Sequence, residues 1–286
     1  MIKTSRVGFR LCLVRLSMGL CLWFTACQPD AIEPKLGKPT PTSQIPKDSL
    51  NRPDSVVSGR RLRITWAATD FQELELDAQG LPLHHISQYL YNMGTGDVKR
   101  HENRFVYDEN QRLIRVETTY LGKVSTSKYF YEGDQIHRVE VYAPAGNLTA
   151  IHRFLYTSDN RLKQTETDRP LSKSIIRLTY TYDRKGNVTE VIEGVKDPQM
   201  DTYVRQFSIT YGDYDDQKYV EHLLTGEPFL PNVPLQVNNY RLKVVSDRNG
   251  KELSRETFSY TYNEQGLPTE KVKHGPGGTS RASITY

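Results

Sequence analysis

The sequence predicts an all-β protein: an antiparallel meander of hairpin repeats that forms one strongly curved, barrel-like or two-layer sheet. Two observations lead to this fold class. Apolar and polar residues alternate along short segments such as residues 114–120, and period-two alternation is typical of strands with one buried face. A similar segment ending in tyrosine also recurs about every 25 residues, which is the length of one hairpin with its turns.

Residues 1–26 are expected to be an export signal. Lys3, Arg6, Arg10 and Arg15 form a basic start, and the apolar run from Leu16 to Ala26 follows. About 20 apolar residues are needed to cross a bilayer as a helix. A basic start followed by a shorter apolar run is therefore typical of a cleaved secretory signal.

The signal ends Phe24-Thr25-Ala26-Cys27. Because Cys12 and Cys21 lie inside the signal, Cys27 is the one cysteine of the mature chain, and it has no partner for an internal disulfide. These residues resemble a bacterial lipobox. The resemblance implies lipidation at Cys27 and therefore the membrane as a partner through a lipid anchor. Gln28 instead of Asp then implies an outer-membrane lipoprotein, with the leaflet left open.

Residues 27–60 are expected to be the lipidated cysteine and a tether, since proline and small polar residues dominate and such a segment buries little surface.

The net charge of the chain bears on one class of partner, the nucleic acids. The chain has 38 basic and 34 acidic residues, and removal of the four basic residues of the signal leaves 34 of each. A neutral mature protein gives no reason to expect nucleic acid as a partner.

Residues 61–286 are expected to be one domain of hairpin repeats. The repeat tyrosines end successive strands and are Tyr107, Tyr131, Tyr156, Tyr182, Tyr211, Tyr262 and Tyr286. Several are followed by a turn with Asp or Asn first and Gly later, as in Tyr182-Asp183-Arg-Lys-Gly186. Asp can accept hydrogen bonds from the turn backbone, and Gly accepts a positive φ. We expect these tyrosines to pack in the core with their hydroxyls at its edge.

This pattern, Tyr-Asp-x-x-Gly-x-Leu/Val over most of residues 70–286, resembles the YD repeats of RHS-type proteins. It also resembles repeat-bearing lipoproteins of Gram-negative bacteria that have no assigned function. In RHS proteins such repeats build a β-sheet shell around a toxin. The resemblance implies a β-sheet built from repeats, but this chain has no toxin domain to enclose.

Residues 225–239 interrupt the repeat. Pro228, Pro231 and Pro234 lie here, and proline is excluded from central strands, so we expect an ordered loop insertion. Aromatic and apolar residues in and around it lie off the main register and form the candidate binding surface: Tyr214, Tyr219, Phe229, Leu230 and Tyr240.

The sequence offers little for catalysis. The seven histidines show no metal-ligand spacing, and no nucleophile elbow, phosphate-binding loop or dinucleotide fingerprint occurs. We therefore expect no catalytic residue, cofactor or metal.

The leading functional hypothesis is an envelope-anchored lipoprotein with a non-enzymatic binding or scaffolding β domain. An envelope protein or a polysaccharide is the expected ligand class. Two alternatives stay open: an outer-membrane β-barrel protein, whose strands also alternate, and a carbohydrate-active enzyme with an unrecognised site.

Overall fold

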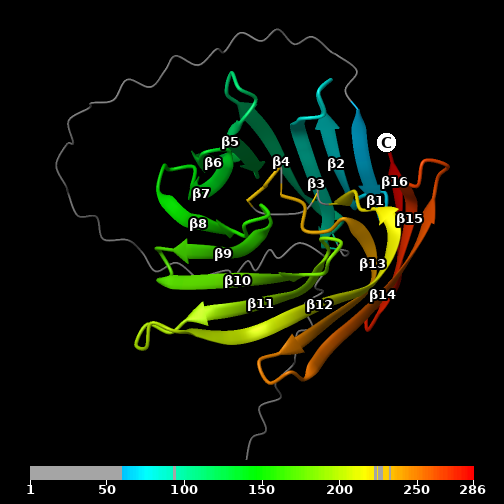
Figure 1. Ribbon diagram of the computed structural model, residues 1–286. Helices are drawn as coiled ribbons and strands as arrows, with labels where there is room; N and C mark the ends of the chain where they lie inside the picture. Colours follow the sequence, from blue (N-terminus) through cyan, green and yellow to red (C-terminus); the bar gives the residue numbers. More distant parts are fainter. Residues whose placement is uncertain (1–59, 93–94, 222–223, 225–227, 232) are drawn as a thin grey trace, which may run out of the picture. The chain divides into compact units, whose positions relative to one another are not determined.

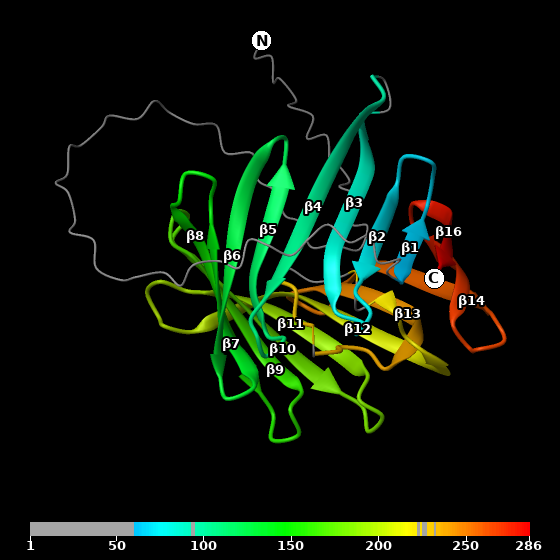
Figure 2. The same cartoon turned by 90° about the horizontal axis from the view of Figure 1, so that it is seen from above.

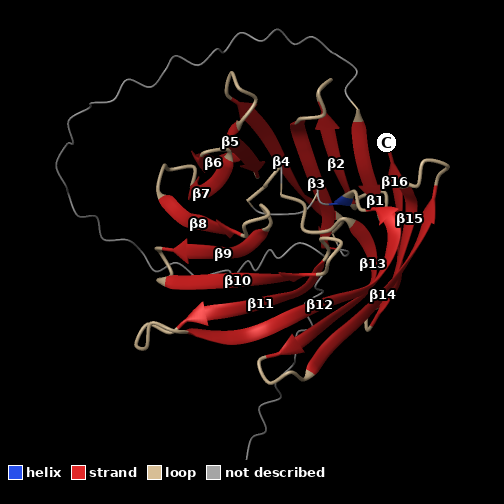
Figure 3. Ribbon diagram, viewed as in Figure 1, coloured by secondary structure: helices blue, strands red, loops and turns tan. Residues whose placement is uncertain are grey.

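Figure 1 shows the fold as a computed structural model, which describes residues 60–286 apart from 93–94, 222–223, 225–227 and 232. In this part of the chain sixteen strands follow one another as an antiparallel meander, and β1 pairs with β16 to close a barrel. Strands and their turns make up nearly all of it (Figure 3). The predicted all-β, barrel-like meander is confirmed. The signal, Cys27 and the tether up to residue 59 lie outside the described residues.

The strands are β1 (Arg61–Thr65), β2 (Phe71–Leu76), β3 (Pro82–Asn92), β4 (Asp97–Tyr107), β5 (Leu113–Tyr120), β6 (Lys123–Glu132), β7 (Gln135–Tyr142), β8 (Leu148–Tyr156), β9 (Leu162–Arg169), β10 (Ser174–Tyr182), β11 (Val188–Lys196), β12 (Tyr203–Lys218), β13 (Asn238–Asp247), β14 (Glu252–Tyr262), β15 (Pro268–Gly275) and β16 (Gly278–Thr285). Neighbouring strands run in opposite directions around the barrel (Figure 2).

Antiparallel order gives the barrel two distinct ends. We call the end where the even-numbered strands finish the tyrosine end, because the repeat tyrosines lie there. We call the opposite end, where each odd-numbered strand turns into the next even-numbered one, the rim end. β1 begins at the tyrosine end with Arg61.

The barrel closes with its side-chain alternation intact. β1 pairs with β16 through Arg63–Thr285, Ile64–Ile284 and Thr65–Ser283. Ile64 and Ile284 are buried, as are Leu62 and Ala282 on the same face. Because a shift by one residue would turn this face outward, the inward aliphatic residues fix the register of closure.

The turns follow the chemistry expected from the sequence. The Asp183 carboxylate accepts a hydrogen bond from the Asn187 N–H at 2.8 Å, and the Asp108 carboxylate accepts two, from the Asn110 and Arg112 N–H groups. The fourth residue of each of these turns has a positive φ: 95° at Gly186 and 61° at Gln111. The two turns therefore share one geometry, and glycine adopts its positive φ without the steric cost that a side chain would add.

The outer wall carries ion pairs between neighbouring strands and along them. Their basic and acidic members alternate with inward-facing residues, so they point away from the interior. Examples are Arg63–Glu73 at 2.8 Å, Arg115–Glu117 at 3.1 Å, Arg138–Glu140 at 3.4 Å, Arg177–Glu166 at 3.1 Å and Arg281–Glu270 at 2.6 Å. In the described part of the chain, no helix is long and apolar enough to cross a membrane.

Candidate functional site in the barrel interior

The tyrosine end is held together by a ring of tyrosine hydroxyls. Each hydroxyl donates a hydrogen bond from an even-numbered strand to a carbonyl at or near the start of the preceding odd-numbered strand. The pairs are Tyr107–Pro82, Tyr131–Leu113, Tyr156–Ile136, Tyr182–Leu162, Tyr214–Val188, Tyr260–Tyr240 and Tyr286–Pro268. The repeat tyrosines thus serve packing and backbone pairing, as expected from their position at strand ends.

Two repeat tyrosines are displaced from this ring. Tyr214 and Tyr260 occupy the places that the spacing predicts for Tyr211 and Tyr262. Tyr211 packs edge-on against Tyr240, with ring centroids 4.8 Å apart, and the Tyr262 hydroxyl bonds the Asp215 carboxylate. The ring changes register where β12 runs on to 16 residues before the insertion.

The insertion between β12 and β13 folds into the barrel. We call its described residues, 219–221, 224, 228–231 and 233–237, the plug. The Phe229 ring meets Phe105 of β4 edge-on, with centroids 4.9 Å apart, and Leu224 is buried in the same core cluster. Because β4 lies across the barrel from β12 and β13, the plug crosses the interior (Figure 1).

A buried ion pair fixes the start of the plug. The Lys271 ammonium of β15 donates to both carboxylate oxygens of Glu221, at 2.7 and 2.9 Å, and the two side chains are 7% and 5% exposed. The same ammonium lies 4.9 Å from the centroid of the Phe258 ring. Aromatic faces and a bidentate carboxylate therefore replace the water that this charge has lost.

Asn187 fixes the return of the plug to the wall. Its fully buried side-chain oxygen accepts hydrogen bonds from the N–H groups of Val237, at 2.9 Å, and Asn238, at 2.8 Å. Its amide nitrogen donates to the Asp183 carboxylate and to the side-chain oxygen of Asn238. One side chain thus joins the turn between β10 and β11 to the start of β13.

Three of the five residues of the candidate binding surface come together: the Tyr219 and Tyr240 ring centroids are 6.1 Å apart, and Tyr214 pairs with Tyr240 across β12 and β13. Tyr219 is 6% exposed and Tyr240 is 1% exposed, so these two cannot belong to an exposed surface. Phe229 and Leu230 pack against the core cluster, and the Tyr214 hydroxyl also bonds the Gln236 side chain at 2.9 Å. The expected surface is corrected to a packed interior, because the barrel takes in the apolar part of the insertion.

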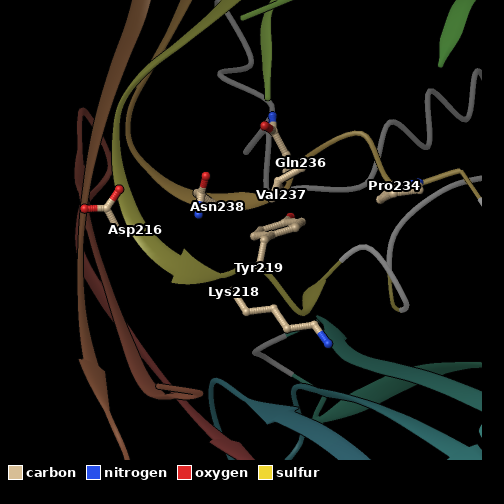
Figure 4. Close-up of a pocket in the computed structure, with 7 residues that line it drawn as sticks. All are labelled: Asp216, Lys218, Tyr219, Pro234, Gln236, Val237 and Asn238. Atoms are coloured by element: carbon tan, nitrogen blue, oxygen red, sulfur yellow. The ribbon is translucent and has the colours of Figure 1, made fainter. Parts of the chain in front are cut away.

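A hollow of about 500 Å³ remains where the plug returns to β13 (Figure 4). Its lining residues are Asp216, Lys218, Tyr219, Pro234, Gln236, Val237 and Asn238. Tyr219 lies next to Val237, and the Tyr219 N–H donates to the Val237 carbonyl at 2.9 Å. The hollow is therefore bounded by the two chain segments that lead into and out of the plug.

Toward the rim end, the inner wall changes from apolar to polar. His85 of β3, Asn103 of β4 and Thr118 of β5 form a hydrogen-bonded row, with His85 Nδ1 3.1 Å from the Asn103 amide nitrogen and the Thr118 hydroxyl donating to Asn103 at 2.7 Å. Closer to the rim, the His101 ring stacks on Tyr120 with centroids 4.2 Å apart. Pattern reasoning missed this region because these residues are scattered over three strands.

Charged residues also face the interior. Glu256 of β14 accepts an ion pair from Lys243 at 3.4 Å and one from Lys273 at 3.2 Å. Burial lowers the pKa of Lys243 against the opposing effect of Glu256, and burial raises the pKa of Glu193 on β11. In the described ranges, no group of three His, Cys, Asp or Glu side chains is placed to hold a metal ion.

Two interior histidines make stability depend on pH. Burial, aided by the neighbouring charges of His84 and His101, lowers the pKa of His85 to about 4. Burial, together with the charge of Arg169, lowers the pKa of His152 to about 4 as well. The His152 Nδ1 lies 2.9 Å from the Thr167 hydroxyl. Both rings are neutral in the folded protein at pH 7.

We expect the free energy of unfolding to fall as the pH drops from about 6.5 to about 4. Above this window both states hold neutral histidines; within it only the unfolded chain takes up the protons. Urea unfolding of His152→Asn and of the parent at each pH measures this contribution. The stability difference between them should change steadily across the window, and a constant difference would contradict the assignment of His152.

No family model matches the chain, and no curated protein matches it. The fold is similar to that of two solved structures. A porin-like protein from Bacteroides uniformis has a TM-score of 0.52 at 12% identity, over 80% of this chain and 96% of that chain. One from Bacteroides vulgatus has a TM-score of 0.52 at 11% identity, over 80% and 98%. At these identities the similarity shows a shared barrel fold.

The Photorhabdus luminescens Tc holotoxin pore has a TM-score of 0.23, with 75% of this chain and 12% of that chain covered at 18% identity. A TM-score of this size is no evidence of a shared overall fold. The resemblance of the repeats to YD-repeat proteins therefore stays a prediction from the sequence.

Proposed function

We propose that this chain is an envelope lipoprotein whose barrel lies in water and acts as a non-enzymatic binding or scaffolding domain. One observation carries the proposal: the ion pairs along the outer wall. They occupy outward positions on strands all around the barrel, from β1–β2 to β15–β16. The lipid anchor at Cys27 and the tether would then hold the barrel at the membrane, with an envelope protein or a polysaccharide as its ligand.

The magnitudes favour water over lipid at this wall. An exposed ion pair contributes only about 0–1 kcal/mol in water, so these pairs cost the folded protein little there. An Arg or Lys side chain that faces lipid near the bilayer midplane costs roughly 2–4 kcal/mol. Arg115, Arg138 and Arg177, on three strands, would add these costs together.

The shared fold of the porin-like proteins supports the main alternative, a β-barrel protein of the outer membrane. Both proposals use the same closed barrel, and they differ in what the outer wall contacts. Phe229 packing on Phe105 fills the space where a pore would run, which argues against an open channel under either proposal.

Cell fractionation of Cys27→Ser separates the two proposals. In a Gram-negative host we expect the parent to need detergent for release from the envelope, and Cys27→Ser to be released by a carbonate wash, which removes peripherally bound protein. Cys21→Ser is the matched control, because it lies inside the signal and should fractionate like the parent. If Cys27→Ser stays in carbonate-washed membranes, the barrel itself is embedded and the proposal fails.

A further inference from the structure

Exposed apolar side chains are distributed unevenly between the two barrel ends. At the rim end, hairpin after hairpin carries a large apolar side chain at or beside its tip. These residues are Trp66 (42% exposed), Tyr91 (64%), Leu121 (74%), Leu171 (77%), Met200 (67%) and Leu253 (59%). They come from six different hairpins, those of β1–β2, β3–β4, β5–β6, β9–β10, β11–β12 and β13–β14.

The tyrosine end differs. Its turns begin with residues such as Asp77, Asp108 and Asp183, and these turns carry no large apolar residue among those exposed in the described chain. Four exposed large apolar residues of the described chain lie near that end: Ile114 and Leu155 on the strands, Val237 in the plug and Tyr286 in the tyrosine ring. The rim end has more of them, and Trp66, Leu121, Leu171 and Met200 lie in its turns. Scattered apolar exposure is normal for a soluble protein, but here it is concentrated at one end of an up-and-down barrel.

Backbone strain marks the same tips. Leu121 has a φ of 49°, and Lys173, two residues after Leu171, has a φ of 51°. Such turn positions favour Gly, Asn or Asp, and a bulky side chain there costs about 1 kcal/mol or more. Leu121 is 74% exposed, so packing within the barrel does not recover this cost. The two-residue turn between β5 and β6 requires the positive φ but not a leucine, and a bulky residue kept there indicates a function for its side chain.

We propose that the rim end docks onto a lipid surface, with the apolar tips inserted at the boundary of headgroups and acyl chains. This inference rests on the proposed water-exposed barrel. The tips belong to separate hairpins, and hairpins two strands apart lie about 10 Å from one another. A protein partner is usually held by one contiguous, packed patch, whereas lipid accepts isolated apolar wedges one by one.

The chemistry of the tips fits this occupant. Leu171 is followed by Lys173, and Leu121 by Lys123, so an aliphatic side chain that enters the lipid has a lysine beside it at headgroup level. Trp66 and Tyr91 have the amphipathic rings that are enriched at membrane interfaces.

Flotation with vesicles tests the docking without the anchor. The protein is the mature chain, residues 27–286 with Cys27→Ser, and the vesicles contain phosphatidylethanolamine and phosphatidylglycerol. We expect this chain to float with the vesicles. Leu121→Ser combined with Leu171→Ser should lower the vesicle partition coefficient about tenfold. Trp66 is the only tryptophan of the mature chain, and its emission should shift to shorter wavelength on binding.

The matched control combines Ile114→Ser with Leu155→Ser, which removes two exposed aliphatic side chains from strands near the tyrosine end. Its partition coefficient should equal that of the parent. The docking proposal is overturned if the parent does not float, or if the vesicle partition coefficient falls equally in the two double variants. Failure of the proposed function gives a different result, namely a Cys27→Ser chain that needs detergent to stay in solution.

Discussion

Lys271→Met is expected to destabilise the protein by about 3–5 kcal/mol, because it leaves the Glu221 carboxylate buried without its cation. The pair joins the plug to β15 inside the barrel, where both side chains are under 10% exposed. Urea unfolding, with the transition followed by circular dichroism, measures the loss. Where the single variant fails to fold, the double variant Glu221→Gln and Lys271→Met still tests the pair, and it should be more stable than Lys271→Met alone.

Lys185→Met is the matched control. Lys185 makes an ion pair of the same length with Asp216, 2.7 Å, but the side chains are 65% and 85% exposed. We expect no measurable loss of stability there, because water already solvates both groups. A loss at Lys271 no larger than that at Lys185 would mean that the plug is not held by the buried pair.

Asn187→Ala is the second substitution with a large expected effect, about 2–4 kcal/mol, since two backbone N–H groups of the returning plug lose their acceptor. Native-state hydrogen exchange measures the effect of Asn187→Ala at individual backbone amides. The amides of Val237 and Asn238 should exchange faster than in the parent, and those of the strands opposite should be less affected.

Asn147 occupies the same position in the turn between β7 and β8, but its side chain is exposed. Asn147→Ala should therefore leave stability within about 0.5 kcal/mol of the parent. Equal effects at the two asparagines would show that the turn itself, and not its bonds to the plug, accounts for the loss.

The local structure could be predicted from the sequence because its causes are local. Period-two alternation places Val116 inward and Arg115 outward without any knowledge of the neighbours. The turn pattern is equally local: where the repeat lacks glycine, Asn160 takes the positive φ, at 63°. The repeat therefore predicts strands, turns and the direction of most side chains.

Closure and the plug could not be predicted in this way. Closure depends on Ile64 meeting Ile284 across nearly the whole domain, and nothing near either residue specifies that pairing. The inward fold of Phe229 and Leu230 depends on the size of the barrel. A barrel of sixteen strands encloses more space than its own side chains fill, so an apolar insertion gains more by entering it than by staying in water. From sequence alone the same residues indicated an exposed binding surface.

The polar inner wall is a similar case. His85, Asn103 and Thr118 are unremarkable along the chain, and they form a row only after three strands align. The ion pairs of the outer wall also became a functional argument only in three dimensions. In the sequence, Arg177 and Glu166 are polar residues on two different strands, and nothing in the alternation of either strand shows that they pair.

The central claim is that the outer wall faces water, and a spin label on that wall tests it most directly. Lys128 is exposed on the body of β6 and points outward, and the chain with Cys27→Ser has no other cysteine after the signal. Lys128→Cys in that background, labelled with a nitroxide and mixed with vesicles, should be accessible to a water-soluble relaxing agent and shielded from oxygen dissolved in lipid. A label that oxygen reaches more readily than the water-soluble agent would place the wall in the bilayer and contradict the account.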